Sequence, residues 1–334
     1  MNRRLYGRHV PRTRQETKMR LKIDDLLKKH GYHRAGRHSV VKTCLWLNRS
    51  LRGEESCYKS RFYGIQSHRC IQMTPTLSCN HRCLHCWRPI EVPVPLPTSS
   101  DWDSPVEIKG SILAEQMRLI SGYGGSETTD MAALEEARKP NQVAISLAGE
   151  PTLYPHLPEL IDEFKADGMT TFVVSNGTQP DMIAKIAPTQ LYISLNAPDE
   201  ETYLRVCNPC GNFWEDIKRS LKVMGARRSG KGAMVVTGEG ATTRTRTRTA
   251  IRITLIKGFN IFDPAGYARL LLMAEPDYIE VKAYMHVGFS RKRLGRDAMP
   301  EHEEVLSFAS EICDETGYRI VDDVGVSRVV LLSR

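Results

Sequence analysis

The chain has 334 residues, of which 41% are hydrophobic and 26% are charged. This balance is typical of a globular protein with a large buried core, and no apolar run approaches the roughly 20 residues that span a bilayer. A formal net charge of +8 favours polyanionic partners such as RNA without naming one. Nine cysteines, an odd number in a chain of this length, argue against a secreted disulfide scaffold.

The first twenty residues are rich in arginine but contain no apolar run. Because a secretory signal needs such a run, we expect a solvated basic arm here and a protein that stays in the cytoplasm. Residues 1–70 are expected to form an extension that packs on a larger unit of residues 71–334.

Short apolar runs alternate with helical patterns from residue 71 onward. Each run is rich in β-branched residues and is bounded by Gly, Pro or Asn, as buried parallel strands are. The expected strands are Ile71–Leu77, Val143–Leu147, Thr171–Val174, Leu191–Leu195, Ile251–Ile256 and Tyr278–Val281. Amphipathic patterns at Leu157–Ala166 and Phe213–Met224 predict helices between them. The alternation predicts an α/β fold with a parallel sheet, open or closed into a barrel.

A polar residue follows each expected strand. These residues are Cys79, Glu150, Asn176, Asn196, Lys257 and Lys282. In β/α barrels the chemistry gathers at the carboxyl ends of the strands, where the following loops converge. We therefore expect these residues to share one site.

Two segments depart from the alternation. Residues 122–139 are expected to form a helix and a loop outside the barrel. Residues 237–250 read TGEGATTRTRTRTA, a low-complexity composition that predicts a solvated loop.

Three cysteines form a C-x3-C-x2-C loop directly after the first expected strand: Cys79, Cys83 and Cys86. Thiolates are the usual protein ligands of iron–sulfur clusters, and three in one tight loop can hold a [4Fe-4S] cluster with one iron left open for S-adenosylmethionine. Structural zinc needs four closed ligands, and this loop has no matching downstream pair. The spacing favours iron and sulfur over zinc.

A second set of cysteines lies upstream at equal intervals of 13 residues: Cys44, Cys57 and Cys70. The spacing alone leaves two interpretations open, three small buried side chains or a second three-cysteine cluster. The Cys207–Cys210 pair has no partner pair nearby and is expected to be structural. Cys313 lies in an apolar helical stretch and is expected in the protein core.

The loop SCNHRCLHCWRP resembles the cluster loop of radical S-adenosylmethionine enzymes, and Trp87-Arg88 after it resembles the archaeal 4-demethylwyosine synthases. The resemblance extends to CYKSRFYGIQSHRCIQMTP (57–75), AISLAGEPTLYP (144–155), TTFVVSNGT (170–178), PTQLYISLNAP (188–198), IRITLIKGFN (251–260) and EPDYIEVKAYMHVGFSRKRL (275–294). It implies a partial (β/α)6 radical SAM barrel with N-terminal and C-terminal extensions. It also implies two [4Fe-4S] clusters, the second on the upstream cysteines.

The resemblance implies a reaction as well. Family members act on N1-methylguanosine at position 37 of tRNA-Phe, add two carbons from pyruvate and close the third ring of the wyosine skeleton. The chain has no room for the flavodoxin domain of the eukaryotic relatives, so an external electron donor is implied. We expect a monomer.

Residue roles follow from the same resemblance. Gly149 and Glu150 match the family's Gly-Glu motif, whose carboxylate accepts from the S-adenosylmethionine ammonium. Asn176 and Asn196 fit hydrogen bonds to its ribose or carboxylate, although many relatives carry Asp where Asn196 stands. Lys59 is the first candidate for a Schiff base with pyruvate and Lys282 the second; alternatively, the open iron of the second cluster chelates pyruvate.

RNA contacts are expected from Arg291, Lys292 and Arg293 together with the basic N-terminus. Trp87 fits either stacking on a splayed base or core packing. Competing functions are another radical SAM reaction on RNA, such as methylthiolation, an activase, or a non-catalytic metal-containing RNA-binding module. An activase would lack the second cluster, and a methylthiotransferase carries its extra cluster in a longer separate domain.

Overall fold

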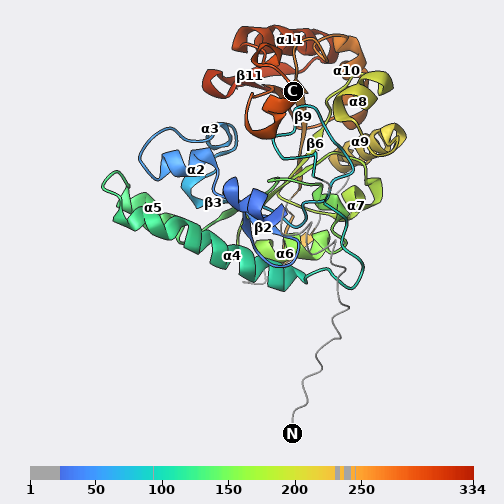
Figure 1. Ribbon diagram of the computed structural model, residues 1–334. Coiled ribbons are helices and arrows are strands. Elements are labelled where there is room, and N and C mark those ends of the chain that lie inside the picture. Colours follow the sequence, from blue (N-terminus) through green and yellow to red (C-terminus); the bar gives the residue numbers. More distant parts are fainter. Residues whose placement is uncertain (1–22, 93, 230–233, 237–241, 245) are drawn as a thin grey trace.

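The computed structural model describes residues 23–334 apart from 93, 230–233, 237–241 and 245. The arginine-rich N-terminus lies outside this range. A ten-stranded sheet runs through the molecule in the order β1-β2-β3-β4-β5-β6-β9-β10-β12-β11 (Figure 1). Among the described residues, no helix is long and apolar enough to cross a membrane.

Six parallel strands form the centre of the sheet. They are β3 (Cys70–Thr74), β4 (Gln142–Ile145), β5 (Thr170–Ser175), β6 (Gln190–Ser194), β9 (Arg248–Leu255) and β10 (Tyr278–Ala283). Each overlaps one of the six expected strands, and the fold is the predicted partial barrel. The parallel sheet is almost wholly buried, as expected when helices cover it.

Antiparallel strands extend the sheet at both edges. β1 (His33–Arg34) and β2 (Val40–Val41) precede β3, while β12 (Val329–Ser333) pairs with β10 and β11 (Arg319–Val324) pairs with β12. None of these four strands was predicted from the sequence. β1 and β2 have two residues each, too short to give a periodic signal.

Helices cover the outer face of the sheet (Figure 1). They are α4 (Pro105–Ser121), α6 (Leu157–Ala166), α7 (Pro180–Lys185), α8 (Glu200–Cys207), α9 (Trp214–Ser229), α10 (Pro264–Ala274) and α11 (His302–Thr316). Their buried side chains, among them Ile112, Phe164, Leu221 and Phe308, form one core cluster with the outward-facing side chains of the strands. Cys313 lies on α11 and packs against this core as predicted.

The segment 122–139 contains a 3-10 turn (Gly122–Gly125) and α5 (Met131–Ala137). Leu134 and Ala137 pack against Leu47 and Leu51, near α2 (Leu45–Ser50), so the segment joins the N-terminal extension. α3 (Tyr58–Tyr63) packs against the sheet instead. Its Tyr63 packs inside the curve of the sheet against Phe172 and Tyr192.

The prediction of a loop through residue 250 is wrong at its end, since Arg248–Ala250 begin β9. Thr249 explains the difference: its N–H and hydroxyl donate to the Asp277 carboxylate at 2.8 and 3.1 Å, and the Asp277 N–H donates back to the hydroxyl at 3.0 Å. This exchange fixes the register of β9 against β10. Earlier in the segment, Thr242–Arg244 form strand β8, which pairs with β7 (Met234–Val236); residues 237–241 and 245 lie outside the described residues.

Replacing Asp277 with asparagine is expected to cost about 1–2 kcal/mol of unfolding free energy at pH 7. Burial raises the pKa of Asp277, but hydrogen bonds from Arg246 and Thr249 outweigh it, and the pKa lies below the ordinary 3.8. The ionised form is therefore stabilised by folding, and its contribution is present above pH 3.8 and is lost as the pH falls through the lowered value. Urea unfolding at pH 7 and pH 3 measures this, with exposed Glu127→Gln as the control; an equal difference at both values would contradict it.

Candidate functional site

One cavity opens at the carboxyl ends of the parallel strands and encloses, with its mouth, about 1050 Å³. Such a position is where β/α barrels carry their chemistry. Four of the six strand-end residues predicted to share a site line it: Cys79, Glu150, Asn176 and Asn196. The other two do not. Lys257 is exposed and pairs with Glu304 at 2.6 Å, because the chain turns outward after β9; Lys282 lies within β10.

The cysteine loop forms one wall of the cavity, with Cys79, Cys83 and Cys86 all lining it. The Arg88 guanidinium donates to Cys86 Sγ at 3.2 Å and also to the carbonyls of Leu77 and His81. The His81 amide donates to Cys79 Sγ at 3.4 Å. Hydrogen bonds to the sulfurs and a nearby cation are the outer-shell features that support a thiolate-bound cluster.

Burial raises the pKa of the Cys79 thiol to about 12 and also raises that of Cys86. In such surroundings the thiolate forms only where a positively charged centre compensates for the lost solvation. Three half-buried cysteines beside one cavity therefore fit an iron–sulfur cluster, which would be held by Cys79, Cys83 and Cys86.

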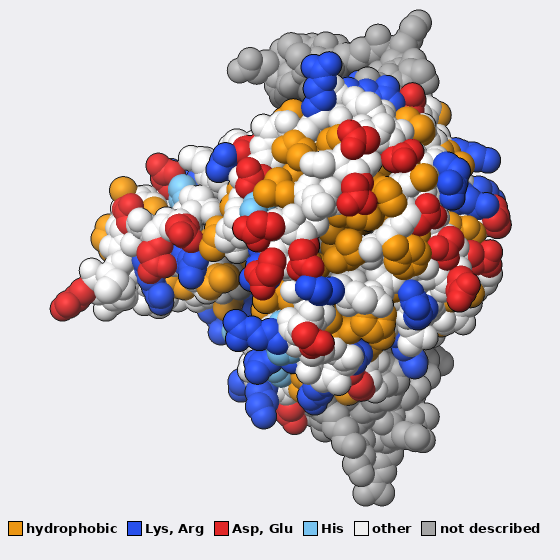
Figure 2. Space-filling model, turned by 90° about the horizontal axis from the view of Figure 1, so that it is seen from above, with side chains coloured by type: hydrophobic (Ala, Val, Ile, Leu, Met, Phe, Trp, Pro, Cys, Tyr) orange, Lys and Arg blue, Asp and Glu red, His pale blue; other side chains and the backbone are white. Residues whose placement is uncertain are grey.

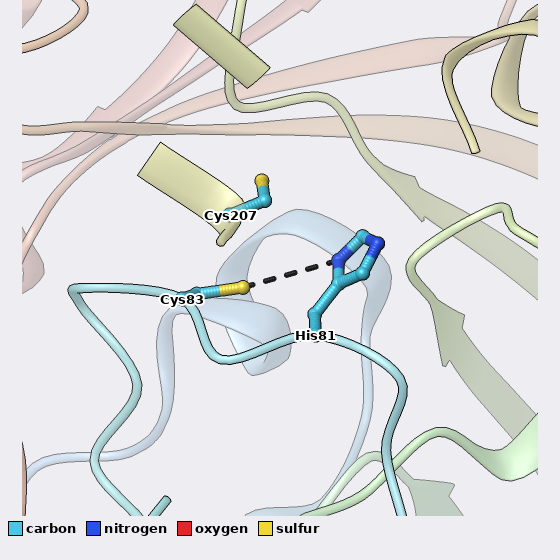
Figure 3. A group of neighbouring side chains, drawn as sticks. All are labelled: His81, Cys83 and Cys207. Atoms are coloured by element: carbon cyan, nitrogen blue, oxygen red, sulfur yellow. Dashed lines mark hydrogen bonds between the residues drawn. The ribbon is translucent and has the colours of Figure 1, made fainter. Parts of the chain in front are cut away.

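The end of α8 braces the cysteine loop. Arg82 N–H donates to the Cys207 carbonyl and Leu84 N–H to the Val206 carbonyl, at 3.1 and 3.0 Å. The side chains of His81, Cys83 and Cys207 meet here, with ligand atoms within 4.8 Å of one another (Figure 3). Because Cys83 belongs to the cysteine loop, this group is part of the same wall rather than a separate metal site.

Glu150 is 2% exposed and has a fixed carboxylate. It accepts from the Thr152 amide and hydroxyl, from the Ser175 hydroxyl and from the Asn176 amide, at 2.6–3.1 Å. Gly149 before it has φ +71°, and a Cβ there would lie 2.1 Å from the Thr76 carbonyl oxygen. Only glycine lets β4 turn so closely against the cysteine loop.

Two asparagines lie at the ends of the next strands. The side-chain amide of Asn176 donates from Nδ2 to Asn80 Oδ1 at 2.8 Å, which links β5 to the cysteine loop. Asn196 accepts from the Thr254 N–H at 2.9 Å. Both line the cavity and have the donors and acceptors that a nucleoside and an amino acid group require.

The upstream cysteines converge although they lie on different elements. Cys44 precedes α2, Cys57 precedes α3, and Cys70 begins β3. Burial raises the pKa of all three thiols, and Cys44 and Cys57 each add to the rise at Cys70 through their charge. The three thiols therefore lie within electrostatic range of one another, and we name Cys44, Cys57 and Cys70 the second cysteine group.

Lys59 and Lys282 both lie near this second group. The Lys59 ammonium lies 5.0 and 4.8 Å from the ring centres of Phe172 and Tyr192, while Lys282 donates to the Ser327 carbonyl at 2.6 Å. Burial lowers the pKa of both, that of Lys282 to about 8. Lys59 is the less constrained of the two amines.

The sequence of this chain is similar to protein families and relatives of known activity. A family model described as Radical SAM superfamily matches residues 73–260, and one described as Wyosine base formation matches residues 273–334. The chain is 42% identical to the S-adenosyl-L-methionine-dependent tRNA 4-demethylwyosine synthase of Pyrococcus abyssi, over 93% of this chain and 88% of that protein. The corresponding protein of Methanocaldococcus jannaschii is 40% identical over 93% and 95%.

The chain belongs to the tRNA 4-demethylwyosine synthase family.

Solved structures of this family agree with the fold. A structure described as TYW1 with a lysine–pyruvate adduct bound has a TM-score of 0.81 and 39% identity, covering 93% of this chain and 95% of that one. A crystal structure of archaeal TYW1 has a TM-score of 0.73 and 37% identity, with the same coverage. As a radical SAM enzyme of this family, the protein uses S-adenosylmethionine and a [4Fe-4S] cluster.

The residues predicted to contact RNA divide into two kinds. Arg291 and Lys292 are exposed. Arg293 is mostly buried and donates to the carbonyls of Leu84 and Cys86, so it also holds the cysteine loop. Figure 2 shows one face of the molecule, where Lys and Arg gather in separate groups among acidic and apolar side chains. The RNA contacts stay a prediction.

Several residues of the site were not predicted from the sequence. Asn80, Arg88, Arg252 and Glu280 were given no role, yet Arg252 lines the cavity and Glu280 lies beside it. Alternation along β9 was a usable signal, because Arg252 and Thr254 fall on the same face of the strand and both line the cavity. Trp87 also lines it, and its ring lies 6.0 Å from that of Tyr32.

Proposed function

We propose that the protein is an S-adenosylmethionine-dependent tRNA 4-demethylwyosine synthase that joins N1-methylguanosine of tRNA-Phe to pyruvate. The observation that carries this proposal is the placing of the Cys79, Cys83 and Cys86 thiols with Glu150 around one cavity in a chain of this family. When bound, the cluster and S-adenosylmethionine supply a 5′-deoxyadenosyl radical that removes a hydrogen atom from the methyl group.

The chain's own residues then have defined tasks. Glu150 would accept from the ammonium of S-adenosylmethionine through Oε2, because Oε1 accepts from Thr152 and Ser175, whereas among the described residues Oε2 accepts from the Asn176 backbone N–H alone. Asn176 and Asn196 would hydrogen-bond its ribose or carboxylate. Arg88 and Arg293 would keep the cysteine loop in place through their bonds to its backbone carbonyls.

Pyruvate would be held by Lys59. Its amine adds to the keto carbon, and loss of water leaves an imine that keeps the acceptor carbon fixed and activated. Burial lowers the pKa of both Lys59 and Lys282, and one feature favours Lys59: its ammonium lies over the rings of Phe172 and Tyr192, whereas the Lys282 ammonium donates to the Ser327 carbonyl. The related TYW1 structure with a lysine–pyruvate adduct bound is consistent with this chemistry.

The second cysteine group would hold a second [4Fe-4S] cluster. Its support is the convergence of Cys44, Cys57 and Cys70 from three elements onto the neighbourhood of Lys59. We further propose that residues 1–70 act with the barrel of residues 71–334 as one monomer in the cytoplasm, with an external electron donor. Arg291 and Lys292 would contact the tRNA backbone.

The testing experiment is an anaerobic reconstitution with iron and sulfide, followed by a pyruvate-dependent assay on tRNA that carries N1-methylguanosine. We expect about eight irons per wild-type chain and about four in a Cys44/Cys57/Cys70→Ala variant, the counts for two cubanes and one. The matched control is Cys210/Cys313→Ala, which removes cysteines outside both groups and should keep about eight.

Mass spectrometry of the nucleosides then measures the product. Four irons in both wild type and variant would remove the second cluster. Two clusters without a pyruvate-dependent product would leave a radical SAM enzyme with another RNA reaction, such as methylthiolation.

A further inference from the structure

Arg252 and Glu280 form an ion pair inside the barrel, where Arg252 lines the cavity and Glu280 is buried beside it. The two residues are direct neighbours in the parallel register of β9 and β10. Arg252 Nε and Nη2 lie 2.9 and 2.8 Å from the same Glu280 oxygen, and the Glu280 side chain is fully buried. The guanidinium also lies 4.8 Å from the centre of the Tyr192 ring. Stacking and pairing together fix the plane of the guanidinium.

Glu280 has no capacity left for a ligand. Besides Arg252, it accepts from the hydroxyls of Tyr58, Tyr63 and Tyr192 at 3.2, 2.8 and 3.0 Å. Two hydroxyls on Oε1, and Arg252 with the Tyr58 hydroxyl on Oε2, leave neither oxygen free, so the carboxylate is saturated and immobile. Its remaining role is to hold Arg252.

Arg252, by contrast, still has a guanidinium donor, Nη1, without an acceptor among the described residues. Its Nε and Nη2 serve Glu280, and Nη2 also donates to the Tyr58 hydroxyl at 2.9 Å. Among the residues that the structure describes, none accepts from Nη1. The side chain is 18% exposed and lines the cavity, so Nη1 is the donor that Arg252 has left for a ligand bound there. A fixed guanidinium edge of this kind is suited to a carboxylate.

The side chains around Arg252 include more basic groups than carboxylates, which favours the binding of an anion. Three basic side chains, Arg252, Lys59 and Lys282, act on one another electrostatically, and Glu280 is the carboxylate that acts on all of them. Buried charges are normally paired, because an uncompensated one costs several kcal/mol. A carboxylate bound beside Arg252 would add a second negative charge to this basic group.

Position favours pyruvate over S-adenosylmethionine as the source of that carboxylate. Arg252 bonds to Tyr58, which adjoins Lys59 in the chain, and both Arg252 and Lys59 lie 4.8 Å from the centre of the Tyr192 ring. In a 2-oxo acid the carboxylate is attached directly to the keto carbon, so a residue that binds it must lie close to the amine that attacks that carbon.

We propose that Arg252 binds the carboxylate of the 2-oxo acid whose keto carbon is attacked by Lys59, and so selects pyruvate over neutral ketones. This inference rests on the proposed role of Lys59. Glu280 is then a positioning residue, which holds Arg252 at the required angle.

The test uses the reconstituted holoenzyme and traps the imine with cyanoborohydride, either with pyruvate or with its neutral isostere pyruvamide. Intact mass gives the extent of trapping against ligand concentration. In the Arg252→Gln/Glu280→Gln variant, which removes both members of the ion pair together, half-maximal trapping should need roughly 10- to 100-fold more pyruvate, the range for a hydrogen bond to a charged group. Pyruvamide should be unaffected, and Arg252→Lys should recover part of the preference.

A variant that still prefers pyruvate as strongly as the wild type would overturn the inference about Arg252 and leave Lys59 intact. A preference that disappears in Cys44/Cys57/Cys70→Ala but survives in the Arg252 variant would also overturn it, since the second cluster would then hold the carboxylate. Absence of any adduct in the wild type would overturn both proposals. Iron content and thermal unfolding confirm that each variant is folded.

Discussion

Replacing Lys59 with methionine is expected to reduce 4-demethylwyosine formation below detection while S-adenosylmethionine is still cleaved. Methionine keeps the length of the side chain and its contact with Phe172 and Tyr192, but it has no amine to form an imine. The measurement is a paired one: product nucleoside by mass spectrometry, and 5′-deoxyadenosine released per chain.

The matched control for this prediction is Lys282→Met. It removes a second partly buried amine from the same region, whose nitrogen is bonded to the Ser327 carbonyl. We expect the control to lose some stability and to keep both the product and the trapped pyruvate adduct. An adduct that persists in Lys59→Met and vanishes in Lys282→Met would transfer the role to Lys282.

Replacing Gly149 with alanine is expected to lower the unfolding free energy by about 2–5 kcal/mol and to abolish the S-adenosylmethionine site. Two costs add here. The backbone has φ +71°, which a side chain disfavours, and the new methyl group would lie 2.1 Å from the Thr76 carbonyl oxygen. Since backbone cannot yield as a flexible side chain does, the turn before Glu150 must move.

A second glycine separates these two costs. Gly168 has φ +74°, but nothing lies within 4 Å of the position that its Cβ would occupy. Gly168→Ala therefore carries the conformational cost alone, about 1 kcal/mol. Denaturant unfolding and equilibrium binding of S-adenosylmethionine compare the two variants; similar losses in both would mean that the close approach to Thr76 has no effect.

The central sheet could be predicted because its signal is local. β-branched runs such as those of β5 and β9 are buried on both faces, so the sequence carries a nearly continuous apolar pattern there. The strands at the edges of the sheet could not be predicted in this way. In β11 the residues Arg319–Val321 are exposed, and the strand exists because β12 pairs with it. Pairing of this kind has no periodic signature in one chain.

The same distinction applies to the site. Cys79, Cys83 and Cys86 lie in one loop, and their spacing alone indicates a cluster. Arg252 and Glu280 are 28 positions apart and become neighbours only through the register of β9 and β10. Lys257 was misplaced for the converse reason: the prediction located the end of the strand but could not give the direction of the chain after it, which leads to Glu304 at the surface.

The contacts of α3 have a consequence for how these proteins can vary. Tyr58 and Tyr63 come from the N-terminal extension, yet they supply two of the donors around Glu280 on the last parallel strand. Loss of either hydroxyl leaves a buried anion short of a partner, and loss of the anion leaves the hydroxyls without an acceptor. Natural variants should therefore change positions 58, 63 and 280 together or not at all, and a chimera that joins one relative's first 70 residues to another's barrel should work only where this set matches.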